Sequence, residues 1–374
     1  MKLKEHPIEA AWLRFRKKHS VVLNLTERLF ESEWGKHHPG LDMSMIAGVP
    51  TTIVETAHTV LLNGTDDIQK AKRIIVGDLG GPGRMAFVQT ASAFLAYRAD
   101  KRIVRIDKRL FESLKNTRFP DKFLTSNLVL PARSVVLTLD GESKSILAYF
   151  DMTSPDTGEP ELVFKLSEYD HNAEDFRLIL AFVVKEDQTL QDAIESHIKW
   201  MLSRHKEIQS VRSEDAGYLS LFGAEKIQAN FVEKYSKHVR DSLVEINGYL
   251  NCILYSIGNS DIVTSTASTR KTSNDPEKAK RFRDLSPQTH SVVGSQYGRV
   301  VQRFLDEERE AVEKSAGGGA SKRPHIRSGH AHIYWKNHPT VKGKKIQIVH
   351  YLPPTVVGKD WDKEADDPTN TKLK

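Results

Sequence analysis

The spacing of apolar residues changes near residue 185, and this change restricts the folds open to the chain. Before it, short runs rich in Val, Ile, Leu and Phe have the length and composition of β-strands. They are Ser134–Leu139, Ser145–Phe150, Glu161–Leu166 and Arg177–Val184. The first two flank Asp140-Gly141, a dipeptide typical of a hairpin turn. We therefore expect residues 1–185 to form an α+β region with a mostly antiparallel sheet.

Residues 186–314 have the spacing of helices instead. Apolar residues recur every three or four positions from Thr189 onward, and again through a long amphipathic helix predicted over Ala224–Ser256. Ser286-Pro287 resembles a helix cap and first turn, which predicts a later helix ending near Lys314. Further helices are predicted over Ala10–Lys18, Leu25–Trp34 and Met85–Tyr97. The region from 186 to 314 is thus expected to be helical.

The composition excludes several classes of protein. The single cysteine, Cys252, cannot form an internal disulfide and excludes a zinc site with several thiolates. The chain has no run of about 18 apolar residues, and its N-terminus lacks the apolar core of a signal peptide. We therefore expect a cytoplasmic protein without membrane contact. The net charge of +6 is compatible with a polyanionic partner but does not require one.

The segment from Ser321 to His350 has the most distinctive composition of the chain. It contains seven Lys or Arg residues, no Asp or Glu, and five of the fifteen histidines. Alternation places Ala331, Ile333 and Trp335 on one face of a strand, and His330, His332, Tyr334 and Lys336 on the other. A second strand is predicted over Lys344–Leu352. We expect residues 321–356 to form a basic β-hairpin that packs on the helical region, with a disordered tail over residues 357–374.

Contact with RNA is the leading interpretation of this hairpin, because Lys and Arg bind phosphates while Tyr, Trp and His offer rings for stacking. The residues expected to make the contact are Arg323, His325, Arg327, His330, His332, Tyr334, Trp335, Lys336, Lys344 and Lys345. The alternatives are a metal site of His330, His332 and His338, RNA cleavage by His330 and His332 as acid and base, or a hairpin that only completes the fold. The leading interpretation needs neither catalysis nor a cofactor.

The C-terminal half also resembles a known family. Residues Arg323–Trp335 read RPHIRSGHAHIYW, and a basic strand with a Pro-containing exit follows at Lys344–Pro354. Upstream, Asn251–Asp261 agrees with the same pattern, as does Val293-Gly294 followed by Tyr297-Gly298-Arg299. Over roughly residues 225–355 the chain is similar to plasmid- and phage-borne proteins of the family that contains the second-named type V-A anti-CRISPR protein.

The resemblance implies an inhibitor of the single-chain RNA-guided nuclease of type V-A CRISPR systems. In that family the inhibitor is thought to lower production of the nuclease, because recognition of the nascent N-terminal segment is coupled to loss of the mRNA. The implied partners are the nascent polypeptide of the nuclease and RNA or the ribosome. We expect a groove or sheet edge within residues 1–185 to hold the peptide. A ribonuclease and a non-catalytic interaction scaffold are the alternatives, and the oligomeric state is not predicted.

Overall fold

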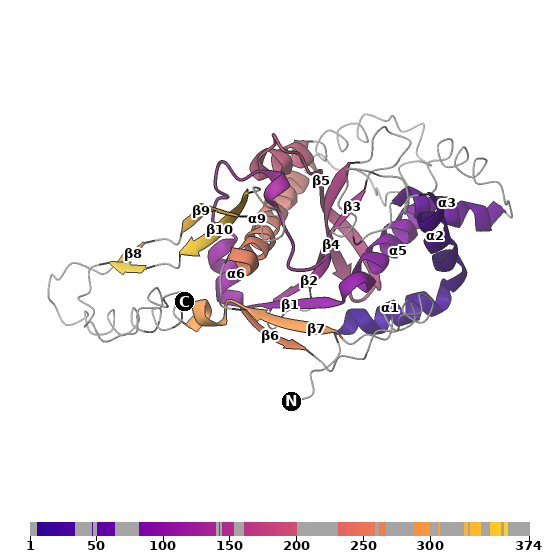
Figure 1. The fold of residues 1–374 in the computed structure, drawn as a ribbon, viewed down its shortest axis with the longest axis horizontal. Helices are drawn as coiled ribbons and strands as arrows, with labels where there is room; N and C mark the ends of the chain where they lie inside the picture. Colours follow the sequence, from indigo (N-terminus) through magenta and orange to yellow (C-terminus); the bar gives the residue numbers. More distant parts are fainter. Residues whose placement is uncertain are drawn as a thin grey trace.

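The structure is a computed structural model whose described part is built on one β-sheet with helices on both faces (Figure 1). It describes residues 6–33, 51–63, 82–139, 144–152, 161–199, 231–258, 262–266, 288–299, 325–327, 330–337, 345–352 and 355–357, with positions 47, 142, 302 and 306. No helix in these ranges is long and apolar enough to cross a bilayer.

The sheet has seven strands in the order β5-β4-β3-β2-β1-β7-β6. The strands are β1 (Arg102–Ile106), β2 (Ser134–Leu139), β3 (Ser145–Met152), β4 (Leu162–Asp170), β5 (Asp175–Val183), β6 (Ile262–Thr266) and β7 (Thr289–Val293). Strands β2 to β5 form an antiparallel meander, β1 is parallel to β2 and β7, and β6 is antiparallel to β7. The predicted α+β class with a mostly antiparallel sheet is confirmed.

The strand candidates recognised in the sequence correspond to β2, β3, β4 and β5, and β2 pairs with β3 as the predicted hairpin requires. Every residue of β2 and β3 is buried. Helices pack on both faces of the sheet, so neither face of these strands meets water. Their sequences are consequently apolar runs, without the alternation of a sheet that has one solvated face.

The helix predicted to start at Ser286-Pro287 is wrong over Thr289–Val293, because these residues form β7. The strand pairs with β1 on one side and β6 on the other, and this pairing overrides the cap-like local sequence. Helical structure begins after Gly294, whose φ of 83° favours glycine, and it includes residues 295–299. The expectation of a purely helical region is therefore wrong for β6 and β7, while the domain boundary at residue 185 stays a prediction.

One face of the sheet is covered by a layer of N-terminal helices (Figure 1). These are α1 (Pro7–Lys18), α2 (Ser20–Glu33), α3 (Thr51–Asn63) and α5 (Pro82–Asp100). The helices predicted over Ala10–Lys18, Leu25–Trp34 and Met85–Tyr97 correspond to α1, α2 and α5, although Trp34 lies outside the described residues. A buried ion pair joins the layer internally, with Lys101 Nζ 2.7 Å from Glu9 Oε1.

The other face carries α6 (Lys108–Leu114), a helix over residues 190–199, and α9 (Phe231–Gly258). The long helix predicted over Ala224–Ser256 is confirmed from Phe231 onward, and residues 224–230 lie outside the described part. Cys252 is buried on α9, and this burial raises the pKa of its thiol. The thiol packs within the core on this face of the sheet.

Two antiparallel ribbons follow at the C-terminal end. Strand β9 (His330–Asn337) pairs with β10 (Lys345–Leu352), and β8 (His325–Arg327) pairs with β11 (Thr355–Val357). The predicted β-hairpin is confirmed, and β9 with β10 is called the hairpin below. Strand β8 lies beyond the hairpin, away from the sheet (Figure 1). Apart from Val357, the tail predicted to be disordered lies outside the described residues.

Candidate nucleic-acid interface

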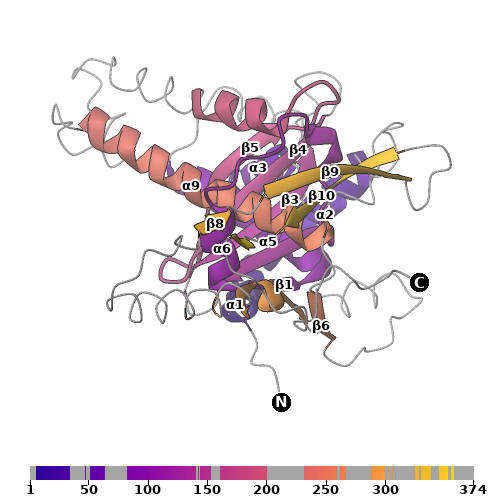
Figure 2. The same cartoon turned by 90° about the vertical axis from the view of Figure 1, so that its left-hand side faces the viewer.

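The inner face of the hairpin attaches it to the C-terminal part of α9 (Figure 2). This face consists of Ala331 and Ile333 from β9 with Gln347, Val349 and Tyr351 from β10. Val349 and Tyr351 are each only 3% exposed and belong to the core around α9. A Cβ atom placed on Gly258 would lie 1.7 Å from the carbonyl oxygen of Val349. The end of α9 therefore touches the backbone of β10 and needs a glycine there.

The buried side-chain amide of Asn251 on α9 holds the inner face of the hairpin. The hydroxyl of Tyr351 donates to Asn251 Oδ1, and burial raises the pKa of that hydroxyl, which keeps it protonated as a donor. The Nδ2 group of Asn251 donates to the carbonyl oxygens of Leu114 at 3.2 Å and Thr117 at 2.9 Å. One side chain thus connects the hairpin, α9 and the chain that follows α6.

The outer face of the hairpin carries exposed rings. It consists of His332 and Tyr334 from β9 with Ile348 and His350 from β10. His332 is exposed, and Tyr334 is 51% exposed. The ring centroid of Tyr334 lies 6.3 Å from that of His332 and 6.3 Å from that of His350. The predicted position of His332 and Tyr334 on one accessible face is confirmed, and His350 is a third ring that the predicted contact set omitted.

Trp335 lies on the same face of β9 as Ala331 and Ile333, as predicted, but its side chain is 57% exposed. Trp335 is in register with Gln347, which meets polar groups in place of an apolar core. The Oε1 atom of Gln347 accepts from Asn127 Nδ2 at 3.0 Å, and its Nε2 donates to the Lys122 carbonyl at 3.3 Å. Both aromatic side chains of the pair Tyr334-Trp335 are therefore available to a partner.

The other predicted contact residues fall into three groups. Lys345 is exposed at the start of β10. Strand positions, but not side chains, are described for His325 and Arg327 in β8 and for His330 and Lys336 in β9. Arg323 and Lys344 lie outside the described residues. The binding roles of all these residues stay predictions.

The metal and cleavage alternatives gain no support from the residues that the structure describes. Within those ranges, no three His, Cys, Asp or Glu side chains are close enough to hold a metal ion together. The predicted metal set of His330, His332 and His338 includes a residue outside the described part, so it stays a prediction. The same holds for His330 and His332 as an acid and base pair.

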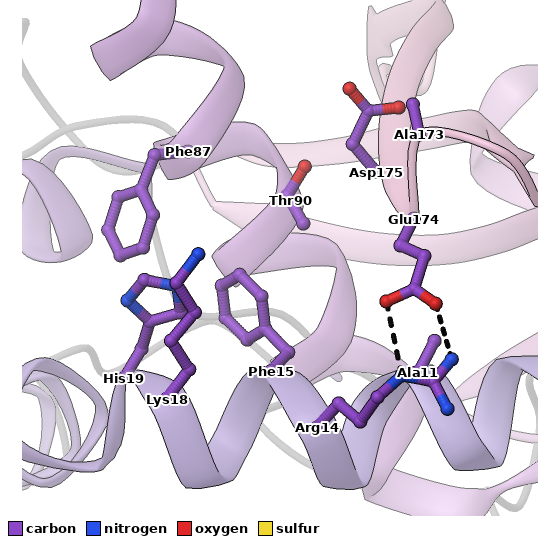
Figure 3. A pocket seen from close by; sticks show the side chains of 10 residues that line it. All are labelled: Ala11, Arg14, Phe15, Lys18, His19, Phe87, Thr90, Ala173, Glu174 and Asp175. Carbon is purple, nitrogen blue, oxygen red and sulfur yellow. Dashed lines mark hydrogen bonds and ion pairs between the residues drawn. The ribbon is translucent and has the colours of Figure 1, made fainter.

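A separate pocket of about 440 Å³ lies between α1, α5 and the turn from β4 to β5 (Figure 3). Three rings gather on one side of it, with centroids 4.7 Å apart for Phe15 and His19 and 4.9 Å apart for His19 and Phe87. On the other side Arg14 Nε donates to Glu174 Oε2 at 3.2 Å. Burial, then the charges of Lys18 and His58, lowers the pKa of His19. The pocket therefore combines a neutral aromatic wall with a charged rim.

The edge strand β5, next to this pocket, is occupied by side chains of the protein itself. The backbone N–H of Phe176 donates to Thr90 Oγ1 at 3.1 Å. Farther along, the His197 side chain hydrogen-bonds to the backbone of Ile179 and Ala181. Such covering protects an edge strand from pairing with another chain. Addition of a peptide strand to β5 would require these contacts to break, so the pocket is the better candidate for a peptide receptor.

Comparisons with known proteins agree with this architecture. A family model described as "AcrVA2-like: Anti-CRISPR type V subtype A2 family" matches residues 104–359, more than half of the chain. The structure is similar to a solved structure entitled "Crystal structure of AcrVA2", with a TM-score of 0.50 and 14% identity, covering 94% of this chain and 99% of that chain. No curated protein sequence matches the chain. The resemblance inferred for residues 225–355 is confirmed and extends to residue 104: the chain belongs to the AcrVA2-like family, the anti-CRISPR type V subtype A2 family.

Proposed function

We propose that the chain lowers production of the type V-A CRISPR nuclease by recognising its nascent polypeptide and promoting loss of its mRNA. Membership of an anti-CRISPR family supports the inhibitory role. The mechanism needs one surface for a peptide and another for RNA. The observation that carries the proposal is the outer face of the hairpin, where Tyr334 and His332 are exposed while the inner face is held by α9.

RNA contact is the role proposed for the outer face. Tyr334 and His332 offer exposed rings on this face, and Lys345 adds an exposed cation at the start of β10, in register with the other face of the ribbon. Rings and cations together are the usual components of single-strand-binding surfaces. Tyr334 and Trp335 are both more than half exposed, so neither ring serves to fill the core. The exposure supports a binding role over a purely structural one.

Peptide contact is the role proposed for the pocket between α1, α5 and the β4–β5 turn. Its wall of Phe15, His19 and Phe87 suits an apolar or aromatic side chain, and its rim carries Lys18 and Asp175 for polar groups of the peptide. The pocket lies far from the hairpin, across the sheet (Figure 1). One molecule can therefore hold a peptide and RNA at the same time.

The test is a translation reporter in cells that express a type V-A nuclease gene with and without the chain. Messenger RNA and nuclease protein are measured together. We expect both to fall several-fold when the natural N-terminal peptide is encoded. Synonymous recoding should preserve the effect because the peptide is unchanged, whereas a frameshift confined to that segment should abolish it.

A pair of variants makes the reporter specific for the two surfaces. His332→Ala combined with Tyr334→Leu should remove the effect on mRNA, and so should Phe87→Ala. Val21→Ala is the matched control, because Val21 is 64% exposed and belongs to neither surface. Loss of nuclease activity with unchanged mRNA and protein would contradict the proposal and indicate direct inhibition of the finished enzyme.

A further inference from the structure

We infer that the outer face of the hairpin binds unpaired RNA, with one base stacked on the ring of Tyr334. The inference rests on the RNA contact proposed above and names the form of RNA that the face accepts. It follows from three properties of the face: the exposure of Tyr334, the position of the two histidines, and the attachment of the ribbon from the opposite side.

The exposure of Tyr334 makes its ring available as a platform. About half of the side chain is in contact with solvent, and the ring projects from the middle of β9. Base stacking on aromatic rings tolerates any sequence because every base has a π-face. Bases in a duplex are stacked on each other, so a protein ring reaches a base face only where the RNA is unpaired. An exposed tyrosine thus favours single strands.

The two histidines form a cross-strand pair beside one end of this platform. His332 precedes Tyr334 by two residues on β9, and His350 lies opposite His332 on β10. Each imidazole centroid is 6.3 Å from the tyrosine centroid, and the ring planes are inclined at 50° and 70° to the tyrosine ring. The Nδ1 atom of His350 lies 3.4 Å from the carbonyl oxygen of Gly258 at the end of α9, whereas His332 is exposed, so His332 is the better placed of the two to reach a stacked base or the sugar–phosphate backbone. The pair therefore places polar groups along one edge of the platform.

The attachment of the inner face keeps the platform in place. Val349 and Tyr351 alternate with Ile348 and His350 on β10, so burial of the first pair against α9 fixes the direction of the second. A platform that is already ordered loses little conformational entropy on binding. Trp335 is also exposed, but alternation along β9 places it on the opposite face, so Tyr334 is the aromatic platform of the outer face.

The experiment measures binding of the full chain to a fluorescein-labelled RNA of twelve unpaired nucleotides and to a duplex of the same strand, by fluorescence anisotropy at one salt concentration. We expect the single strand to bind at least tenfold more tightly than the duplex. Tyr334→Leu should weaken binding of the single strand about tenfold and leave duplex binding unchanged. Tyr334→Phe, which keeps the ring, should bind like the unmodified chain.

Each outcome separates the inference from the proposed function. Equal binding of the two RNAs, with no effect of Tyr334→Leu, would overturn the inference. The proposed RNA contact would still hold in that case, but it would be made to the phosphates and not to a base. Absence of binding to either RNA would overturn both. Because Tyr334 is exposed, both variants should fold, and matching thermal unfolding midpoints would establish this. A weakened Tyr334→Phe variant would also contradict the inference, since the hydroxyl and not the ring would then carry the contact.

Discussion

The helical layer of α1 and α5 and the C-terminal hairpin both contain aromatic and charged side chains, but they use them in opposite ways. In the helical layer, the carboxylate of Glu9 meets Lys101 and the hydroxyl of Tyr97, with less than a tenth of any of these side chains exposed. In the hairpin, the rings of Tyr334 and Trp335 are more than half exposed. The same residue types therefore stabilise the helical layer and stay accessible to a partner in the hairpin. The difference arises because the helical layer buries these side chains, whereas the hairpin is packed against the protein on its inner face alone.

The strongest test of the closed character of the helical layer is Glu9→Ala. The substitution removes the carboxylate that lies 2.7 Å from Lys101 Nζ. The buried ammonium of Lys101 then loses this ion pair. We expect the free energy of unfolding to fall by about 4 kcal/mol. Urea unfolding measures this loss. Arg14→Ala is the matched control, because the Arg14–Glu174 pair is largely exposed and should contribute far less; equal effects of the two substitutions would contradict the comparison.

Acid should also weaken the helical layer through His6, the cap of α1. Burial, then the nearby His171, His290 and Arg105, lowers the pKa of His6 from 6.5 to about 4. As the pH falls, His6 is therefore protonated in the unfolded chain before it is protonated in the folded chain. The contribution of His6 to the free energy of unfolding is complete above pH 6.5 and is lost progressively down to about pH 4. We expect a loss of about 3 kcal/mol from this group.

Urea unfolding at several pH values checks this prediction. His6→Asn is the informative variant, because asparagine can still cap a helix but does not titrate. Its stability should depend less steeply on pH than that of the unmodified chain between pH 6.5 and 4. If the dependence of stability on pH were the same in both proteins, protonation of the buried His6 would not be what destabilises the helical layer.

Gly258→Ala tests the hairpin side of the comparison. Its Cβ would collide with the Val349 carbonyl, so we expect β10 to shift away from α9 at a cost of about 2 kcal/mol. Hydrogen exchange should rise in β9 and β10 and stay unchanged in β2 and β3. Faster exchange throughout the sheet would instead indicate that the hairpin belongs to the same cooperative unit as the core.

The sequence predicted the regular parts of this fold and missed the parts that depend on distant partners. The apolar runs of β2 to β5 and the alternation of β9 are local signals, and both led to the right elements. Strand β1 (Arg102–Ile106) was missed because Arg102 and Arg105 interrupt its apolar residues. Arg102 lies in the sheet because its guanidinium donates to Ser291 Oγ and the Pro131 carbonyl, neither of which is near it in the sequence.

The candidate sites divide in the same way. His332 and Tyr334 were identified from the composition and spacing of one segment. Trp335 was expected both on the apolar face and in the contact set, and only the structure shows that its side chain is more than half exposed. The pocket was not predicted, since Arg14 and Glu174 are separated by 160 positions and meet only in the folded chain. Local patterns indicated which residues are chemically distinctive, and the topology determined which of them face solvent.

Cross-linking tests the RNA contact of the outer face most directly. Cells that express the chain with a type V-A nuclease gene are irradiated with ultraviolet light, and the cross-linked peptides of the purified chain are identified by mass spectrometry. The account predicts that nucleotides attach to peptides covering β9 and β10, with Tyr334 modified and the signal lost in His332→Ala combined with Tyr334→Leu. Nucleotides attached only outside the two ribbons, or the same cross-links in that variant, would contradict it.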